Sequence, residues 1–221
     1  MIDLALHEKF VLLTINDEKG TIAYGYSKSY GFAGILLMEL YNRNLVEIKD
    51  KKISFTDKTT DSSILNDALK ILKERKKPPK INQAIHLLSQ KMHKHFDRVI
   101  ERLVEKDILK IADKKVLWLF NVKYYPTQNP EPENLVKSKI KSIVLYGDHP
   151  DPESLCLISL IHVLDLYKEV FSKEEKKKAK KKVKEIVKEQ KIAGDIQNII
   201  QQEIMIAVNA GVTAATIATT N

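Results

Sequence analysis

Most of the chain carries apolar residues at helical spacing, and this pattern predicts a mainly α fold. The expected helices cover residues 4–15, 31–40, 64–76, 81–106, 133–146, 152–171, 173–191 and 194–219. The range 31–40 is apolar on nearly every side, so this helix should be buried among the others. Pro78 and Pro79 separate two helices, because the residue before a proline is pushed out of helical geometry. We interpret residues 1–221 as a single globular helical domain with a buried central helix set.

Two segments interrupt the helical pattern, and each is typical of a short β-hairpin. The first pairs Leu45–Ile48 with Ile53–Phe55, and the second pairs Ile108–Ile111 with Val116–Val122. An offset of 63 residues superimposes the two segments with five identities in fourteen positions, which gives modest support for an internal duplication. The same alignment places the polar turn of the second hairpin at Asp113–Lys115.

A helix that leads into a hairpin is also the plan of a winged helix, so tandem nucleic-acid binding is an alternative function. A wing that contacts DNA usually carries Arg or Lys, whereas the second hairpin carries Leu117, Trp118, Leu119 and Phe120 on its outgoing arm. Trp118 is the only tryptophan of the chain. Such an apolar arm is a core strand, a contact between subunits or a segment that enters a membrane, and the pattern leaves all three open.

Composition narrows the class of protein. With 221 residues, 43% of them apolar, the chain can bury a substantial core. It has a single cysteine and no Cys-x-x-C or Cys/His cluster, so we predict no disulfide framework and no metal site, and expect a cytosolic location. The charged N-terminus argues against a signal peptide. The longest apolar stretch, residues 204–218, is shorter than the ~20 residues of a membrane-spanning helix.

Known catalytic sequence patterns are missing as well. The sequence has no glycine-rich phosphate loop, no paired-histidine helix and no nucleophile elbow. We therefore predict a binding protein, with no cofactor, and not an enzyme.

The formal charge of +8 is concentrated in one segment. Between Lys173 and Lys191 there are ten lysines and four glutamates, which leaves only +2 for the rest of the chain. Ala179, Val183 and Ile186 give this segment an inward apolar stripe. The lysines form either a solvated helix surface or a landing surface for an anionic partner, which would be nucleic acid or an anionic membrane.

Several segments, taken in order, resemble the Golgi phosphoprotein 3 family. They are Leu4–Ile15, Gly31–Leu40, Asp67–Leu69, Glu101–Leu109, Leu117–Phe120 with Pro126, and Leu157–His162. The resemblance implies a mostly helical domain and a peripheral membrane protein that binds phosphatidylinositol 4-phosphate. In eukaryotic members it also implies an adaptor that holds the cytosolic tails of glycosyltransferases in Golgi membranes. A short chain of this kind resembles the prokaryotic branch of the family.

The resemblance assigns the residues of the family's lipid site to four positions of this sequence. Its aromatic residue, in the loop before the buried helix, corresponds to Tyr24. Its three arginine positions correspond to Ala33, His93 and Phe96, none of which offers a guanidinium for bidentate phosphate binding.

Other basic residues nearby offer a different cradle. Lys91, Lys94, Arg98 and Arg102 recur on one helix face, although acidic residues beside that face are also typical of a solvated helix. We predict a lipid-binding site made of Tyr24, Lys28, His93, Lys94 and Arg98, and a membrane or subunit contact made of Leu117, Trp118, Leu119 and Phe120.

The expected partner is an anionic phospholipid on the cytosolic face of a membrane, which would be the Golgi in a eukaryote. Cytosolic tails of membrane proteins, and a second copy of the chain bound through the hairpin at residues 108–122, are further expected partners. Nucleic acid is the less favoured one.

Overall fold

The computed structural model describes residues 2–16, 20–21, 26–116, 120–192, 196, 199–200, 202–204 and 206. In chain order the helices are α1 (Leu6–Leu12), α2 (Tyr26–Asn42), α3 (Ser63–Lys73), α4 (Ile81–Lys91), α5 (His93–Glu105), α6 (Glu131–Lys141), the π-helix η1 (Ser142–Tyr146), α7 (Pro152–Val163), α8 (Tyr167–Val170) and α9 (Glu175–Ile192). The strands are β1 (Val46–Lys49), β2 (Lys52–Phe55), β3 (Ala112–Val116) and β4 (Phe120–Tyr124). The mainly α fold predicted from the sequence is confirmed.

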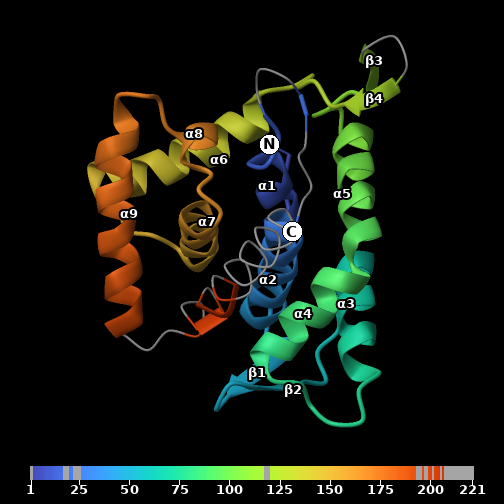
Figure 1. Ribbon diagram of the computed structural model, residues 1–221. Coiled ribbons are helices and arrows are strands. Elements are labelled where there is room, and N and C mark those ends of the chain that lie inside the picture. Colours follow the sequence, from blue (N-terminus) through green and yellow to red (C-terminus); the bar gives the residue numbers. More distant parts are fainter. Residues whose placement is uncertain are drawn as a thin grey trace, which may run out of the picture.

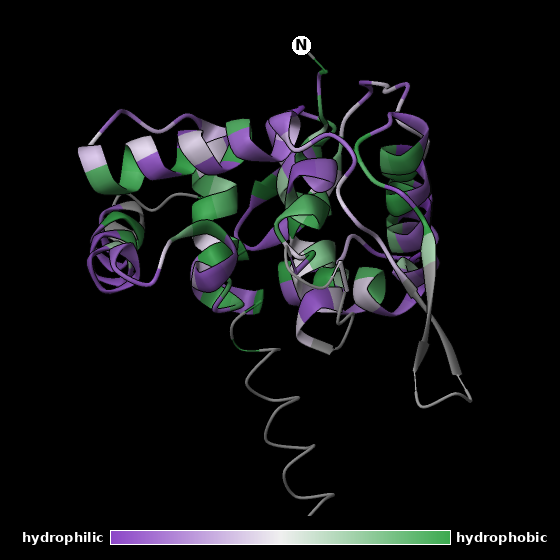
Figure 2. Ribbon diagram, turned by 90° about the horizontal axis from the view of Figure 1, so that it is seen from above, coloured by the Kyte–Doolittle hydropathy of each residue, from purple (hydrophilic) through white to green (hydrophobic). Residues whose placement is uncertain are grey.

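Helices α1 and α2 lie in the middle of the molecule, with α3, α4 and α5 on one side and α6 to α9 on the other (Figure 1). The apolar faces of these helices share one core. Helix α2 is buried almost all round, because its side chains from Phe32 to Leu40 pack against both halves. Helix α9, seen end-on in Figure 2, turns hydrophilic residues outward, while Ala179 and Val183 are fully buried on its inner side.

The central helix begins earlier than the sequence indicates. Residues 26–30, expected in a loop, form the first turns of α2. Tyr30 is buried and its hydroxyl lies 2.6 Å from Nδ1 of His86 on α4, so tertiary packing extends the helix. This corrects the expectation that Lys28 lies in a loop.

Two long helices of the prediction are each broken. The expected helix 81–106 divides at Met92, whose backbone (φ −96°, ψ 6°) leaves helical geometry while its side chain is buried. The break lets α4 pack on α2 and α5 pack on α1. The expected helix 152–171 divides between α7 and α8, where Asp165 has a φ of 51°.

The first hairpin matches its prediction, but the second is displaced. Asp50 and Lys51, with φ values of 51° and 60°, form the two-residue connection of β1 and β2. The second hairpin pairs Val116 with Phe120, so residues 113–115, expected to turn, lie in strand β3.

The physical reason for the displacement lies at the root of the second hairpin. Ile108 and Leu109 are buried, Leu109 forms a bridge with Thr127, and Lys110 donates its N–H to the Pro126 carbonyl at 2.9 Å. This pairing sets the register in which Val116 pairs with Phe120, and Trp118, between them in the sequence, lies outside the described residues. The alignment at offset 63 therefore does not extend to equivalent turns.

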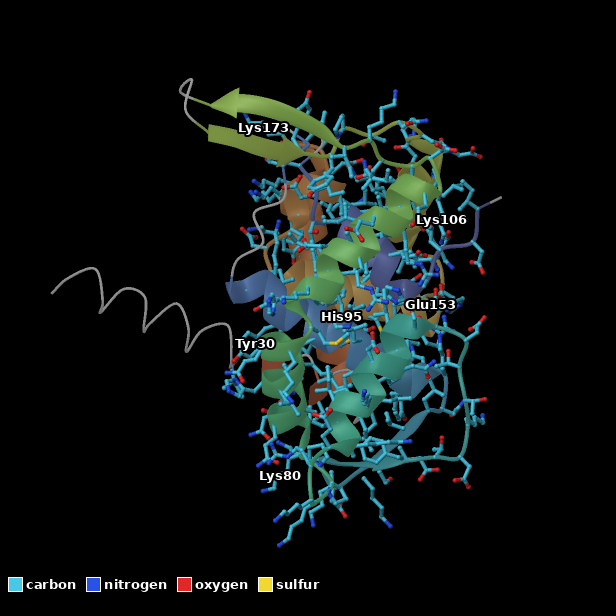
Figure 3. All side chains as sticks on the ribbon, turned by 90° about the vertical axis from the view of Figure 1, so that its right-hand side faces the viewer. Tyr30, Lys80, His95, Lys106, Glu153 and Lys173 are labelled. Atoms are coloured by element: carbon cyan, nitrogen blue, oxygen red, sulfur yellow. The ribbon has the colours of Figure 1, made fainter. Side chains whose placement is uncertain are left out.

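The two hairpins lie at opposite ends of the molecule (Figures 1 and 3). Hairpin β3–β4 projects beyond the upper end of α5, and β1–β2 lies below α2 and α4. Within the described residues, no helix is long and apolar enough to cross a membrane.

Candidate functional site

The projecting hairpin β3–β4 is fixed to the body on its entry side by a partly buried ion pair. Glu8 of α1 is 1% exposed and accepts hydrogen bonds from the Ala5 backbone N–H at 2.8 Å and from Lys106 Nζ at 2.8 Å. Lys106 directly follows α5, six residues before β3 begins, and lies below the hairpin in Figure 3. The ion pair thus holds the end of α5 against the first turn of α1.

On the side where the chain leaves the hairpin, a backbone hydrogen bond also fixes the hairpin to the body. The N–H of Tyr125, the residue after β4, donates to the Gly20 carbonyl at 2.6 Å. Gly20 has a φ of +57°, and a Cβ atom there would come within 3.1 Å of backbone atoms of Tyr125 and Pro126. Glycine is therefore the residue that suits this close approach.

The predicted cationic face of α5 is partly neutralised by α3. Arg98 Nη1 and His95 Nε2 each lie 2.9 Å from the same carboxylate oxygen of Asp67. Burial alone would raise the pKa of Asp67, but these hydrogen bonds outweigh it and hold the pKa below its usual range. Lys91 pairs in the same way with Glu74 at 3.0 Å.

The other predicted lipid-site residues on α5 are exposed. His93 lies at the start of α5 with Nδ1 3.0 Å from the Gln90 carbonyl, and Lys94 follows it. Positions 93, 94 and 98 thus lie along the first turns of one helix, close enough to act together.

Lys28 lies apart from them. It is half-buried in α2, and its Nζ donates to the Thr14 carbonyl at 2.8 Å. Burial lowers its pKa, and Glu169 of α8 raises it in part. Lys28 therefore contacts the chain that follows α1, while Arg98 contacts Asp67 of α3. Tyr24, Leu117, Trp118 and Leu119 lie outside the described residues, and Phe120 begins β4.

Two of the family's three arginine positions lie in the core of this chain. Ala33 is fully buried and Phe96 is 1% exposed. Phe96 packs edge-to-face on Phe32, with ring centroids 5.3 Å apart. A phosphate group could not reach a side chain at either position without disrupting α2 and α5.

The structure brings together a basic cluster that the sequence analysis did not single out. Lys52, Arg75, Lys76, Lys77 and Lys80 line one cleft of about 490 Å³, together with Pro78 and Gln83. We call these five basic side chains the basic cup. The sequence signal was available, because residues 73–80 hold five basic residues and only one acidic residue. This excess is smaller than the one at residues 173–191.

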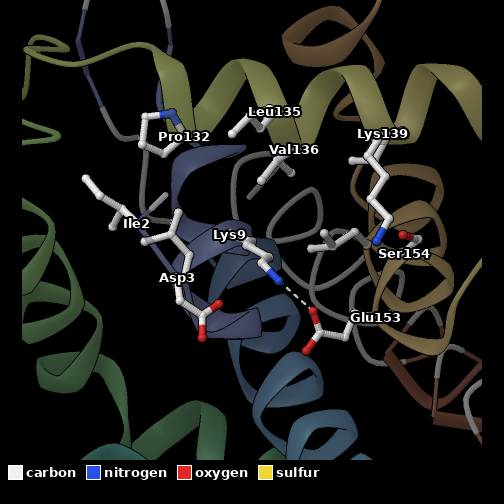
Figure 4. A pocket seen from close by; sticks show the side chains of 12 residues that line it. Ile2, Asp3, Lys9, Pro132, Leu135, Val136, Lys139, Glu153 and Ser154 are labelled. Atoms are coloured by element: carbon white, nitrogen blue, oxygen red, sulfur yellow. Dashed lines mark hydrogen bonds and ion pairs between the residues drawn. The ribbon is translucent and has the colours of Figure 1, made fainter.

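A smaller apolar pocket of about 180 Å³ lies between the N-terminal segment, α6 and α7 (Figure 4). Ile2 and Leu135, both more than 40% exposed, stand at its rim. The Lys9 to Glu153 ion pair, at 2.5 Å, crosses its lower side. Since a cavity of about 150 Å³ holds a benzene ring, this pocket has room for one apolar side chain.

No three His, Cys, Asp or Glu side chains gather as metal ligands would, as far as the described residues go. Comparison with known protein families gives one match that spans nearly the whole chain. Residues 6–204 match the family Golgi phosphoprotein 3 (GPP34). The match includes every helix and strand named above.

Proposed function

The chain belongs to the Golgi phosphoprotein 3 family, and on this premise we propose that it is a peripheral protein that binds anionic phospholipid membranes with hairpin β3–β4 leading. The observation that carries the proposal is the projection of this hairpin beyond the helical body (Figure 1). The sequence that connects its strands is Leu-Trp-Leu, followed by Phe120 at the start of β4. A projecting hairpin with an apolar sequence between its two strands suits the interface of a bilayer.

The expected strength of attachment follows from simple magnitudes. Burying one large apolar side chain contributes roughly 1.5 to 3 kcal/mol. Each lysine held near an anionic surface adds about 1 kcal/mol. Two or three apolar side chains with a few lysines therefore give weak, reversible binding, as expected of a peripheral protein.

The proposal also covers how the lipid head group and a protein partner are bound. We propose that the lipid site uses the positive charges of Lys94 and Arg98, with His93 beside them, because Ala33 and Phe96 lie in the core. A cytosolic tail of a membrane protein could place one apolar side chain in the pocket of Figure 4. Self-association through the hairpin uses the same apolar residues and is the competing proposal.

The test is vesicle flotation with Trp118→Ala, read together with tryptophan emission. If Trp118 enters the bilayer, wild-type emission shifts to the blue when anionic vesicles are added, because the indole moves to a drier place. The substitution should then weaken flotation and leave the helical circular dichroism unchanged. Tyr146→Ala, which removes a 78% exposed aromatic residue on η1, serves as the matched control and should float like the wild type.

Two other results would contradict the proposal. If Trp118 packs in the core, the substitution costs ~3 to 5 kcal/mol of unfolding free energy and vesicles leave the emission unshifted. If Trp118 joins two copies of the chain, light scattering shows the substituted protein as a monomer and the wild type as a dimer, again without an emission shift.

A further inference from the structure

The basic cup gathers five positive charges around one cleft. All five of its basic side chains are exposed, and none of them forms an ion pair within the part of the chain that the structure describes. Among the residues that the structure describes, no acidic one lines the cleft. Glu74, the one acidic residue in the run 73–80, is bound by Lys91 at 3.0 Å. The repulsion among these side chains favours an anion in the cleft.

The backbone that carries the basic cup is held in place by strand-like contacts. Lys52 forms an antiparallel bridge with Lys80, so strand β2 and the start of α4 lie side by side. On either side of this bridge, Ile53 N–H donates to the Pro79 carbonyl at 3.0 Å and Ile81 N–H donates to the Lys51 carbonyl at 2.9 Å. The backbone pairing therefore holds Lys52 and Lys80 in fixed positions relative to each other.

Two further features suit phosphate groups. Helix α4, eleven residues long, begins at Ile81 directly beside Lys80, so the positive end of its dipole adds to the field of the cleft. Arg75 supplies a guanidinium for bidentate contact with phosphate oxygens, and the lysines act as point charges around it.

We propose that the basic cup is a binding site for a compact polyphosphorylated anion, one that carries at least two neighbouring phosphate groups. A compact ligand is favoured because the five charges surround one cleft, whereas a nucleic acid duplex requires a stripe of charge along its backbone. A soluble ligand is favoured over a lipid head group because the cup and hairpin β3–β4 lie at opposite ends of the molecule (Figure 3). The choice of a soluble source rests on the proposed membrane orientation, but the site itself does not.

The experiment measures binding of sodium triphosphate to the full chain by isothermal titration calorimetry, with inorganic phosphate as the single-phosphate comparison. The cup variant is Arg75→Gln/Lys77→Gln/Lys80→Gln. The matched control is Lys173→Gln/Lys177→Gln/Lys181→Gln, which removes three exposed charges from the segment of α9. We expect the cup variant to weaken triphosphate binding by at least about tenfold and the control by less than about threefold. Circular dichroism checks that both variants fold.

Four results would overturn the inference. Equal weakening in both variants would mean that net charge alone attracts the anion. Triphosphate that binds no more tightly than phosphate would exclude a site for neighbouring phosphates. Loss of flotation on anionic vesicles in the cup variant, without loss of triphosphate binding, would assign the cup to a membrane. Loss of duplex DNA binding alone would assign it to nucleic acid.

The same measurements distinguish failure of the basic cup from failure of the proposed membrane binding. Trp118→Ala should leave triphosphate binding unchanged, because strands β3 and β4 and the basic cup lie at opposite ends of the molecule. A chain that binds triphosphate but fails to float would retain the cup and lose the membrane proposal.

Discussion

At the scale of single residues, a buried carboxylate ties the two central helices together. Glu39 of α2 is 2% exposed, and one of its oxygens accepts hydrogen bonds from the His7 backbone N–H at 3.1 Å and from His7 Nδ1 at 2.7 Å. Arg43, the residue directly after α2, lies 2.8 Å from the other oxygen. Nε2 of His7 is buried and has no partner among the described residues. The network joins α1 to α2 at the centre of the core.

Removing the carboxylate should be costly. We expect Glu39→Ala to lower the free energy of unfolding by about 3 to 5 kcal/mol, because it leaves His7 and Arg43 without their shared partner. Urea denaturation of the two proteins at pH 7 measures the difference. Glu47→Ala, at an exposed position of β1, is the control and should change the stability by no more than about 0.5 kcal/mol. A Glu39 variant as stable as this control would contradict the network's role.

The same carboxylate predicts a pH dependence with a definite sign. Burial alone would raise the pKa of Glu39, but the hydrogen bonds and charges of His7 and Arg43 outweigh it and hold the pKa below its ordinary value of 4.5. The stability that the carboxylate contributes is therefore complete above pH 4.5 and is lost as the pH falls through the lower folded-state value. The difference between wild type and Glu39→Ala should shrink between pH 5 and the acid limit of folding, as followed by urea midpoints. A difference that grows on acidification would mean that Glu39 is protonated in the folded protein.

At the scale of elements, the segment around Ile204 packs on the central helix α2 at Gly34, a residue without a side chain. A Cβ atom built on Gly34 would lie 2.0 Å from Cδ1 of Ile204, which is fully buried. Glu203, next to it, lies 3.6 Å from Lys51 in the turn of the first hairpin. The glycine in α2 thus lets residues around 204 reach the core.

A double-mutant cycle tests this docking. Gly34→Ala alone should destabilise the protein by about 1 to 3 kcal/mol, because the new methyl group overpacks the contact. In an Ile204→Ala background the same change should be neutral or stabilising, because the clash is gone and alanine favours a helix by about 1 kcal/mol over glycine. Thermal unfolding of the four proteins gives the coupling. An equal cost of Gly34→Ala in both backgrounds would show that Ile204 does not pack there.

The spacing of apolar residues predicted those helices well that bury a single face. The inward stripe of the lysine-rich segment is confirmed in α9, since Ala179 and Val183 are fully buried. It could not predict the break at Met92, because apolar residues continue at helical spacing on both sides and only packing on two different helices separates α4 from α5. The turn of the second hairpin was misplaced for a similar reason. Its position depends on a contact of Leu109 with Thr127 that is remote in sequence.

The candidate site was harder to predict than the fold. The basic residues of α5 stand where the sequence places them, but Asp67 on another helix takes up part of their charge. The basic cup combines β2 with the loop before α4, and no local pattern indicates that these segments meet. Buried polar pairs are equally invisible, although a single glutamate in the apolar run 35–40 was a usable signal.

At the scale of the whole molecule, the distribution of charge bears on lipid selectivity. Ala33 and Phe96 are buried where the family resemblance places arginines, and the guanidinium of Arg98 on α5 is bound to Asp67. We expect vesicles with phosphatidylinositol 4-phosphate to bind less than about tenfold better than phosphatidylserine vesicles of equal charge, because bidentate contacts are missing. Flotation at matched surface potential measures the ratio, with uncharged phosphatidylcholine vesicles as the baseline. A larger preference would require a dedicated head-group site.

The two anchors at the root of hairpin β3–β4 have a mechanical consequence. Lys106, on the chain entering the hairpin, is tied to Glu8, and Tyr125, on the chain leaving it, is tied to Gly20. Both ties therefore end in the first twenty residues. The hairpin is continuous with α5 and is fastened on both sides to the N-terminal segment, so a sideways displacement of it would be transmitted to α5 and to that segment together. The N-terminal segment thereby acts as a brace for the hairpin.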